Sequence, residues 1–539
     1  MGLKKAILLL ACVTVMNVSA HASATNLYIA QNATGAANGA DCADAKPASF
    51  FNNAGNWGSG SNQIGPGTTV HLCGTFTGTP GSTMLTIQGS GASGSPVIIL
   101  FEPGAVLQAP YWGGDPYSGG PGAIVCNGQS YITIDGGTNG VVKNTANGTG
   151  MTYQRPSTGV YVSSCPYFTV SGSLTISPIY VHTEGDANLS GSALWVQSSD
   201  HFSISGATLE NAFVPLNIGF GSGSAAVTSG KISNNVIDDG CHLFVVGDET
   251  GNSSASGVSI VANTIGPHNQ EWADPAAGCH QDGLFLQSSN SGSAISNFFV
   301  YDNLIQTDMC SDRSYSANNC TSPFFISGVI NSSTIFNNVI RYTTTTGGWE
   351  GMIRLDAISG TQSNDAFYNN TFDENGAGSG QSCDCAAIKF TSDRYSQSGM
   401  VVANNIFMNG DNFHAALMTS DGSFSAKLSQ VNNNDYSGYS NVAYQGSTGT
   451  TFTFGSWQAA GWDANSASAN PSLTAAYILG PTSSILNLGR NLTQLGIVPL
   501  DSDKAGTSRP SAGAWSPGAY QSGGTQAPAP PLGLTATVQ

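Results

Sequence analysis

The sequence repeats one short phrase, in which an asparagine pair or a close variant stands between apolar residues. It occurs as Phe336-Asn337-Asn338-Val339-Ile340 and returns as Ala403-Asn404-Asn405-Ile406-Phe407. Further copies are Ile232-Ser233-Asn234-Asn235-Val236-Ile237, Val261-Ala262-Asn263-Thr264-Ile265, Val300-Tyr301-Asp302-Asn303-Leu304-Ile305, Tyr368-Asn369-Asn370-Thr371-Phe372 and Asn433-Asn434-Asp435-Tyr436. Upstream, glycine takes the place of asparagine in Ile134-Asp135-Gly136, Val170-Ser171-Gly172 and Ile204-Ser205-Gly206. Such internal repetition indicates a solenoid.

The spacing of the phrase favours β-structure. Nine steps of 28 to 40 residues separate Gly136, Gly172, Gly206, Asn235, Asn263, Asn303, Asn338, Asn370, Asn405 and Asn434. Each step holds strand-sized apolar runs between turn residues, and helical spacing is absent. A variable step excludes helical repeats of fixed length, whereas a β-helix accommodates insertions as loops. We therefore predict an all-β, single-stranded right-handed parallel β-helix of about ten or more coils with polar end caps.

The asparagines have a physical role in such a fold. Each coil must bend sharply between strands, and asparagine and glycine accept the left-handed conformation that a sharp bend requires. Asparagine side chains stacked in register can also bond to the asparagines above and below them. We expect an asparagine ladder along the helix.

The chain divides into five predicted segments. Residues 1–24 are typical of a secretory signal peptide, because Lys4 and Lys5 precede an apolar stretch and Ala22-Ser23-Ala24 is a small-residue cleavage site. The others are an N-terminal cap segment (25–66), the β-helix (67–440), C-terminal coils and cap (441–520), and a Pro-rich linker or tail (521–539). We therefore expect a secreted protein, extracellular or periplasmic.

Composition limits the partners. Only 9% of the residues are charged and the net charge is −17, which argues against nucleic acid, whose phosphates require Lys and Arg. A polyanionic substrate would need the few cations gathered in one groove. After the signal peptide no stretch is apolar over the roughly 18 residues that a membrane span needs. We expect a monomer whose partner is a polysaccharide.

The cysteines fit an oxidising compartment. Eleven are present, and ten remain after Cys12 of the signal peptide is removed, enough for up to five disulfides. Cys42/Cys73 and Cys310/Cys320 are the pairs expected first, because each closes a short loop. No Cys/His spacing indicates zinc. Calcium is compatible with the many Asp and Asn, but no Asp-x-Asp-x-Asp loop is present, so no metal ligands are assigned.

Candidate site residues lie in the long insertions and on the strands after them. The insertion after Asn263 carries Trp272, His280 and Asp282, an aromatic ring with acid and base groups. Tyr315 and Trp349 lie in later insertions. Strand alternation places one row of side chains outward, namely Phe285, Phe325, Arg354, Lys389 and Leu417. Trp272, Phe285, Phe325, Trp349 and Tyr315 are the predicted substrate-binding residues.

The chain resembles the pectin-lyase-like superfamily of right-handed parallel β-helices over roughly residues 65–520. Gly67-Thr68-Thr69-Val70 and Ser95-Pro96-Val97-Ile98-Ile99 look like the start of its chondroitinase-B-like and alginate-lyase-like branch. That resemblance implies a polysaccharide lyase acting on a uronic-acid polymer.

The candidate catalytic residues are Lys389, Arg354, Asp282 and His280. In the lyase hypothesis, Lys389 removes the proton beside a uronate carboxylate that Arg354 holds. In a glycoside hydrolase of the same fold, Asp282 would protonate the glycosidic oxygen, with Asp239 or Glu271 as the second acid. A non-catalytic surface or adhesion protein is the third alternative.

Overall fold

The computed structural model describes residues 25–522, except 61, 115–120, 184, 189, 221–226, 249–253, 269–271, 273–278, 289–290, 310–319, 346–349, 378–384, 393 and 411–412. The predicted signal peptide and residues 523–539 lie outside the described residues.

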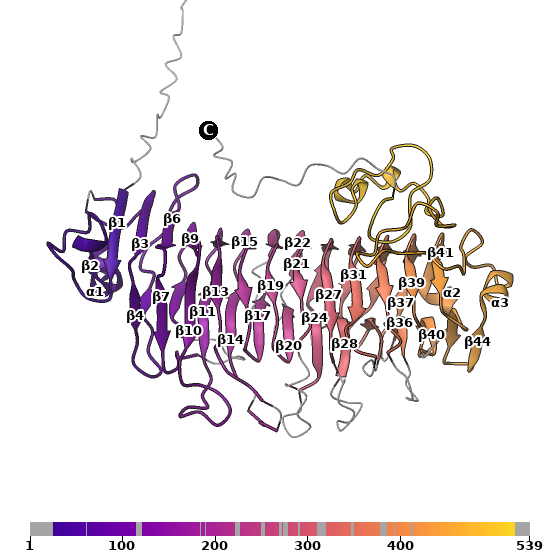
Figure 1. Cartoon of the computed structure of the whole chain (residues 1–539), viewed down its shortest axis with the longest axis horizontal. Helices are drawn as coiled ribbons and strands as arrows, with labels where there is room; N and C mark the ends of the chain where they lie inside the picture. Colours follow the sequence, from indigo (N-terminus) through magenta and orange to yellow (C-terminus); the bar gives the residue numbers. More distant parts are fainter. Residues whose placement is uncertain are drawn as a thin grey trace, which may run out of the picture.

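The described chain winds into three long sheets and a short one (Figure 1). In spatial order, the first sheet contains β2 (Lys46–Pro47), β1 (Thr25–Ala30), β3 (Thr68–Leu72), β6 (Val97–Phe101), β9 (Ile132–Asp135), β12 (Thr169–Ser171), β15 (Phe202–Ser205), β18 (Gly230–Ser233), β22 (Val258–Val261), β26 (Phe299–Tyr301), β30 (Thr334–Phe336), β34 (Ala366–Tyr368), β38 (Met400–Ala403) and β41 (Leu428–Asn432). The second contains β4 (Thr75–Thr77), β7 (Val106–Ala109), β10 (Gly140–Asn144), β13 (Leu174–Ile176), β16 (Thr208–Leu209), β19 (Val236–Ile237), β23 (Thr264–Ile265), β27 (Leu304–Thr307), β31 (Val339–Tyr342), β35 (Thr371–Asp373), β39 (Ile406–Met408) and β42 (Asp435–Ser437).

The third sheet carries the site described below. It contains β5 (Leu85–Thr86), β8 (Ile124–Asn127), β11 (Thr158–Ser163), β14 (Ser192–Gln197), β17 (Val214–Gly219), β20 (His242–Asp248), β24 (Gln281–Ser288), β28 (Cys320–Gly328), β32 (Ile353–Asp356), β36 (Ala386–Thr391), β40 (Ala415–Thr419), β43 (Ala443–Gln445) and β44 (Thr450–Phe452). The short fourth sheet contains β21 (Ser254–Ser256), β25 (Ala294–Ser296), β29 (Ile330–Asn331), β33 (Gln362–Ser363) and β37 (Gln397–Ser398).

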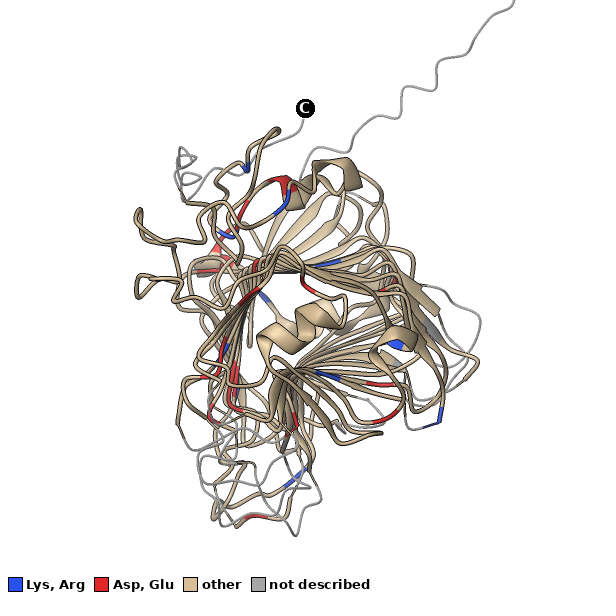
Figure 2. Cartoon of the chain, turned by 90° about the vertical axis from the view of Figure 1, so that its right-hand side faces the viewer, with Lys and Arg blue, Asp and Glu red and all other residues tan. Residues whose placement is uncertain are grey.

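Consecutive coils add parallel strands to each long sheet, so the sheets form the sides of a prism (Figure 2). Only β43 and β44 pair antiparallel among the described strands. Crossovers between parallel strands are right-handed because of the strand twist. This strand order confirms the predicted right-handed parallel β-helix.

The two ends of the stack are closed by short elements. At the first end, β1 pairs with β3, and α1 (Ala48–Asn52) buries Phe51 against the interior. At the other end, α2 (Phe424–Lys427) and α3 (Phe454–Ala459) bury Phe424 and Trp457. In the part of the chain that the structure describes, no helix is long and apolar enough to cross a membrane.

The predicted asparagine ladder is confirmed. Each amide nitrogen Nδ2 donates to Oδ1 of the next asparagine at 2.9–3.1 Å, and the row runs through Asn235, Asn263, Asn303, Asn338, Asn370, Asn405 and Asn434. These side chains are at most 1% exposed. Because every buried amide group is paired along the row, the ladder fixes the register of successive coils.

One detail of the turn prediction is wrong. The left-handed residue is the one before each ladder asparagine, as in Asn234 (φ 57°), Asn337 (φ 55°) and Asn404 (φ 61°). Gly172 and Gly206 align with this first position and not with Asn235, since Ser171, Ser205 and Ser233 are register partners along the first sheet. The residue that must adopt the left-handed conformation at the bend is therefore the one that precedes the ladder asparagine.

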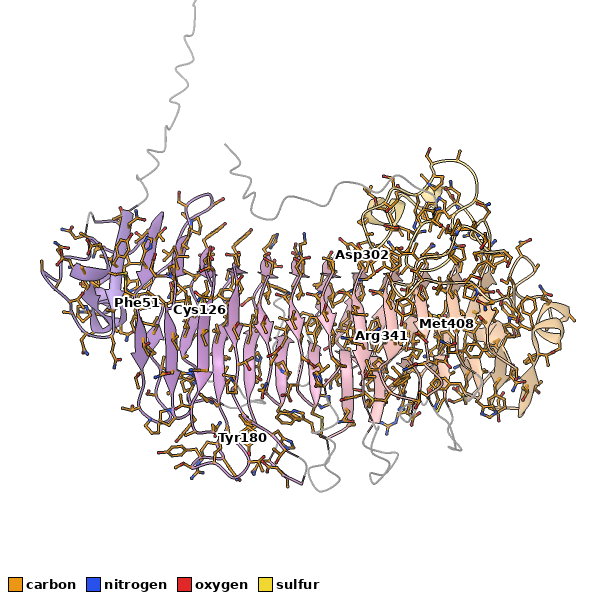
Figure 3. The ribbon with its side chains drawn as sticks, viewed as in Figure 1. Phe51, Cys126, Tyr180, Asp302, Arg341 and Met408 are labelled. Carbon is orange, nitrogen blue, oxygen red and sulfur yellow. A yellow bond between two sulfur atoms is a disulfide. The ribbon has the colours of Figure 1, made fainter. Side chains whose placement is uncertain are left out.

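The outward first asparagines hold the C-terminal segment, defined here as residues 461–522. Their Nδ2 atoms donate to its backbone carbonyls, in the pairs Asn337–Ser502 (2.7 Å), Asn369–Ser516 (3.0 Å), Asn404–Arg490 (2.9 Å) and Asn433–Leu488 (2.8 Å). Lys504 Nζ also donates to the carbonyl of Asp302, which lies beside the segment (Figure 3). The two asparagines of one phrase thus have different roles.

Disulfides reinforce successive coils. Cys42–Cys73 forms as predicted, and Cys126–Cys165 and Cys241–Cys279 are further bridges. Cys385 is also disulfide-bonded. Cys310 of the predicted pair Cys310/Cys320 lies outside the described residues.

We expect at most two reactive thiols when the unreduced, denatured protein is titrated with a thiol reagent. Three bridges use six cysteines, and Cys385 with its partner makes eight of the ten outside the signal peptide. A reduced sample titrated in parallel gives the full thiol count. More than two thiols in the unreduced sample would contradict the disulfide assignment.

Candidate functional site

The predicted outward row of the third sheet is confirmed for four of its five members. Phe285 pairs with Phe325, Phe325 with Arg354, and Arg354 with Lys389 along β24, β28, β32 and β36. The fifth member was wrong: Met418, not Leu417, is the partner of Lys389. Leu417 lies in the inward row, where Leu284, Phe324, Ile353, Ile388 and Leu417 are all fully buried.

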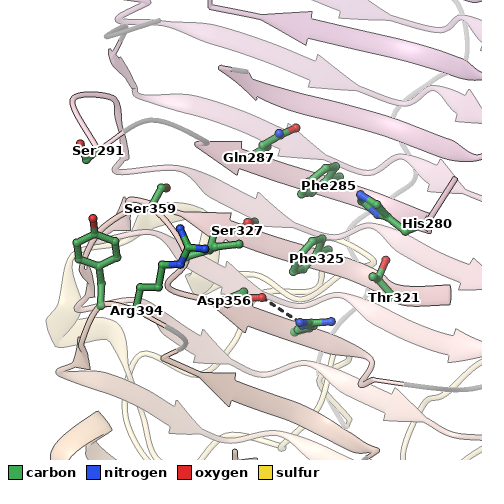
Figure 4. A pocket seen from close by; sticks show the side chains of 13 residues that line it. His280, Phe285, Gln287, Ser291, Thr321, Phe325, Ser327, Asp356, Ser359 and Arg394 are labelled. Atoms are coloured by element: carbon green, nitrogen blue, oxygen red, sulfur yellow. Dashed lines mark hydrogen bonds and ion pairs between the residues drawn. The ribbon is translucent and has the colours of Figure 1, made fainter. Parts of the chain in front are cut away.

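A pocket of about 710 Å³ opens over this row (Figure 4). It is lined by His280, Phe285, Gln287, Ser291, Thr321, Phe325, Ser327, Arg354, Asp356, Ile358, Ser359, Arg394 and Tyr395. His280 and Thr321 lie at one end of the pocket, and Arg394 lies at the opposite end, with the two phenylalanines closer to His280 (Figure 4). The pocket therefore combines an apolar floor with one imidazole and two guanidinium groups.

The floor consists of stacked rings. Phe285 and Phe325 lie parallel with their centroids 4.9 Å apart, and the Arg354 guanidinium lies 5.2 Å from the Phe325 centroid. Since these neighbours cover the Phe325 faces, a bound sugar meets ring edges and not a ring face. The two rings form an apolar floor of the pocket, and their sugar-binding role stays a prediction.

His280 belongs to a hydrogen-bonded cluster centred on a buried carboxylate. Oδ2 of Asp282 lies 2.9 Å from Nδ1 of His280 and 2.8 Å from Nδ1 of His242, and the Thr321 hydroxyl donates to Oδ1. Asp282 is fully buried in β24, whereas the side chain of His280 is 41% exposed. With Nδ1 turned to Asp282, the other ring nitrogen of His280, Nε2, is the one available for proton transfer.

The electrostatics separate the two imidazoles. Burial lowers the pKa of His242 below its ordinary value, despite its bond to Asp282. Burial also disfavours the charged form of His280, but the charge and hydrogen bond of Asp282 outweigh it and raise the pKa of His280. Burial alone would raise the pKa of Asp282, yet the charge of His280 and the hydrogen bonds from both histidines hold it below its usual range. Of the two imidazoles, His280 is thus the one whose protonated form is favoured, by the charge of Asp282.

Arg354 is held by carboxylates on both sides. Its Nη2 lies 2.9 Å from Asp356 Oδ2, and its Nη1 lies 3.5 Å from Glu350 Oε2. The same Glu350 oxygen lies 2.5 Å from Lys389 Nζ. Lys389 is 5% exposed and does not line the pocket, so it reaches the pocket only through Glu350 and Arg354.

Other predicted residues lie elsewhere. Trp272 is fully buried, stacks on His182 at 4.1 Å and donates its indole N–H to Asp239. It therefore offers no exposed platform for a sugar. Tyr315, Trp349 and Glu271 lie outside the described residues.

Sequence reasoning missed His242, Arg394 and Tyr395. His242 precedes β24 by one full coil, so its contact with Asp282 depends on the register β20–β24, in which the two residues are partners. Arg394 and Tyr395 lie in a turn between β36 and β37, where no periodic pattern marks them. The only sequence signal for a binding role was that Arg394 is a cation in a chain with few cations and that an aromatic residue, Tyr395, follows it.

Calcium does not fit these residues. Within the described ranges, the two groups of three or more ligand-type side chains are Cys241–His242–Cys279 and His242–His280–Asp282. Neither offers the all-oxygen set that calcium prefers. Cys241 and Cys279 are bonded to each other, and both imidazole Nδ1 atoms contact one carboxylate oxygen. We assign no metal to these residues.

Comparison with known proteins gives fold neighbours alone. No family model matches the chain, and no curated protein matches it. Solved structures similar to it include pectate lyase Pel9A (13% identity, 93% of this chain and 97% of that chain, TM-score 0.43). Others are the mannuronan C-5 epimerase AlgE6 A-module of Azotobacter vinelandii (13%, 70% and 90%, 0.37) and a lacto-N-biosidase of Eubacterium ramulus (10%, 78% and 67%, 0.40). The parallel β-helix fold rests on the strand order of the chain itself.

Proposed function

We propose that the protein is an exported polysaccharide lyase that cleaves a uronic-acid-containing polymer in the pocket of the third sheet. The observation that carries this proposal is the arrangement around Phe325. His280, backed by Asp282, lies 6.3 Å from the Phe325 ring centroid, and the Arg354 guanidinium lies 5.2 Å from it. A base (His280) and a group that can bind a carboxylate (Arg354) thus lie on either side of an apolar surface about the size of one sugar ring.

The chemistry is a β-elimination. Arg354 pairs with the uronate carboxylate and stabilises the negative charge that develops on it when C5 loses its proton. His280 Nε2 takes that proton, the bond from C4 to the glycosidic oxygen breaks, and a C4–C5 double bond forms. The imidazolium then returns the proton to the departing oxygen, so His280 ends the cycle neutral.

This assignment moves the base from Lys389 to His280. Lys389 is buried against Glu350, whereas His280 reaches the pocket. Glu350 contacts both Lys389 and Arg354, so Lys389 positions the carboxylate that holds the guanidinium. Asp282 likewise acts through His280.

The charge of the lining favours an anionic substrate. The chain has 15 Lys and Arg against 32 Asp and Glu. The pocket nevertheless gathers Arg354, Arg394 and His280 with one lining carboxylate, Asp356. Arg354 is paired with Asp356 and Glu350, and His280 with Asp282, so Arg394 supplies the positive charge that is left for a polyanion in this acidic protein.

The hydrolase scheme is less well supported. A glycosidase acid needs a raised pKa, whereas that of Asp282 is lowered by its two histidines. The lining offers Asp356 alone as a second acid, and Asp356 is paired with Arg354.

The test is a panel of alginate, polygalacturonate, chondroitin, hyaluronan and neutral dextran, incubated with the purified protein. Reducing ends and ultraviolet absorbance of the unsaturated product are read together. We expect absorbance to rise with reducing ends on at least one uronate polymer and not on dextran. Reducing ends without absorbance would identify a hydrolase, and no release from any polymer would favour a binding protein.

Asp282→Asn should move the pH dependence of cleavage. His280 must be neutral to act as a base, so kcat/KM should rise with pH through the raised pKa of His280. Removing the adjacent anion disfavours the imidazolium, and the rising limb should move to lower pH with a lower maximum. The measurement is kcat/KM against pH for both proteins, and a limb that stays in place or moves to higher pH would contradict the pairing.

A further inference from the structure

A second cavity adjoins the pocket. It has a volume of about 340 Å³ and is lined by Ser392, Arg394, Tyr395, Ser396, Gln397, Asp421, Gly422, Ala426 and Lys427. Arg394 and Tyr395 line both cavities. A polymer that extends past the Arg394 end of the pocket therefore meets these two side chains first (Figure 4).

Arg394 differs from the other cations of this region. Arg354 contacts Glu350 and Asp356, and Lys427 Nζ lies 3.2 Å from Asp421. Arg394 is exposed, and within the described ranges no ion pair or side-chain hydrogen bond engages it. Its positive charge is thus available to a ligand.

The rim also carries exposed apolar surface. Tyr395 is 42% exposed and Ile358, on the preceding coil, is 39% exposed. The Tyr395 backbone N–H donates to the carbonyls of Ala357 (3.2 Å) and Ser392 (2.8 Å), which fixes the turn. An aromatic ring at the rim can accept the apolar C–H surface of a sugar, a role for which Trp272 is too deeply buried.

The carboxylate of the second cavity does not oppose an anion. Asp421 accepts hydrogen bonds from the Ser392 backbone N–H and from Lys427. With Asp421 and Lys427 neutralising each other, the charge left in the second cavity is that of Arg394.

We propose that Arg394 and Tyr395 form a second subsite, which binds an anionic sugar residue beyond the residue that reacts. Arg394 pairs with the acidic group and Tyr395 packs on the ring. This inference rests on the proposed lyase function and narrows its substrate: the polymer bears acidic groups on more than one nearby residue, not on an isolated uronate.

Binding without turnover tests the subsite. Affinity electrophoresis of the His280→Gln protein in gels containing alginate, polygalacturonate, dextran sulfate or dextran gives a Kd for each polymer. We expect Arg394→Gln in that background to weaken binding of the preferred anionic polymer about tenfold, as loss of a charge-assisted contact does. Tyr395→Ala should weaken it similarly, whereas Tyr395→Phe keeps the ring and should bind normally.

Arg155→Gln is the matched control, since Arg155 is also exposed but does not line either cavity. A loss confined to uronate polymers identifies a carboxylate as the anion, and a loss confined to dextran sulfate identifies a sulfate. Equal Kd values for Arg394→Gln and Arg155→Gln, or no binding to any anionic polymer, would overturn the subsite.

The subsite and the lyase can fail separately. If Arg394→Gln weakens binding but the unsubstituted protein makes no unsaturated product, the subsite stands and the lyase proposal fails. If the unsubstituted protein forms that product while Arg394→Gln and Tyr395→Ala leave Kd and KM unchanged, the lyase stands and the subsite fails.

Discussion

Asn338→Leu should lower the free energy of unfolding by about 3–5 kcal/mol, because the change breaks the middle of a fully buried ladder. Asn338 Nδ2 donates to the carbonyl of Val300 at 2.9 Å, and its Oδ1 accepts the Asn303 backbone N–H at 3.0 Å. Leucine removes the amide that accepts the Asn303 backbone N–H and that bonds to the Asn303 and Asn370 side chains, and each buried polar group that loses its partner costs about 1–3 kcal/mol.

The control for this substitution is Asn127→Leu, at an exposed position of β8 in the same helix. A surface change of this kind usually stays within about 0.5 kcal/mol. Urea unfolding followed by circular dichroism measures both proteins. Equal unfolding midpoints would contradict the ladder as the element that fixes the coils.

His280→Gln should reduce kcat/KM on the responsive polymer by about 10³-fold, since glutamine cannot accept the C5 proton. His201→Gln is a close control. His201 also contacts an aspartate through Nδ1, at 2.9 Å from Asp200, and its side chain is 42% exposed. It does not line the pocket.

Initial rates of unsaturated product formation, at one pH above the raised pKa of His280, compare the two variants. We expect His201→Gln to keep the full rate. Retention of more than a tenth of the rate by His280→Gln, with folding intact by circular dichroism, would remove His280 as the base.

The fold was largely predictable because its signal is local and periodic. Each copy of the asparagine phrase places an apolar residue inward and an amide in the ladder, so alignment of the copies gives the register of the coils. The adjacent left-handed residue was misplaced by one position, because asparagine and glycine suit both roles. In the structure, the positive φ of Asn337 and the different hydrogen-bond partners of the two residues separate Asn337 from Asn338.

The site was less predictable because it depends on register between distant strands. Arg354 and Lys389 were aligned correctly, since β32 and β36 alternate around charged residues. Leu417 was misplaced because Ala415–Met418 are all apolar, so β40 lacks the charged residue that marks the outward face in β32 and β36. The burial of Trp272 arises from packing on His182, which lies on a loop some ninety residues earlier in the chain. The residues around Trp272 in the sequence therefore do not indicate this contact.

The burial of Lys389 also could not be read from the chain. Glu350, its partner, lies 39 residues earlier, at the end of an insertion. The sequence shows both charges but not that one carboxylate bridges Lys389 to Arg354. That bridge is what moves the proposed base from a lysine to a histidine.

A crystal structure of the His280→Gln protein with a bound oligouronate tests the central claim most directly. We expect a sugar over Phe285 and Phe325, its carboxylate within hydrogen-bond distance of the Arg354 guanidinium, and C5–H directed at residue 280. An oligouronate bound on another face of the helix, or one in this pocket with its carboxylate away from Arg354, would contradict it.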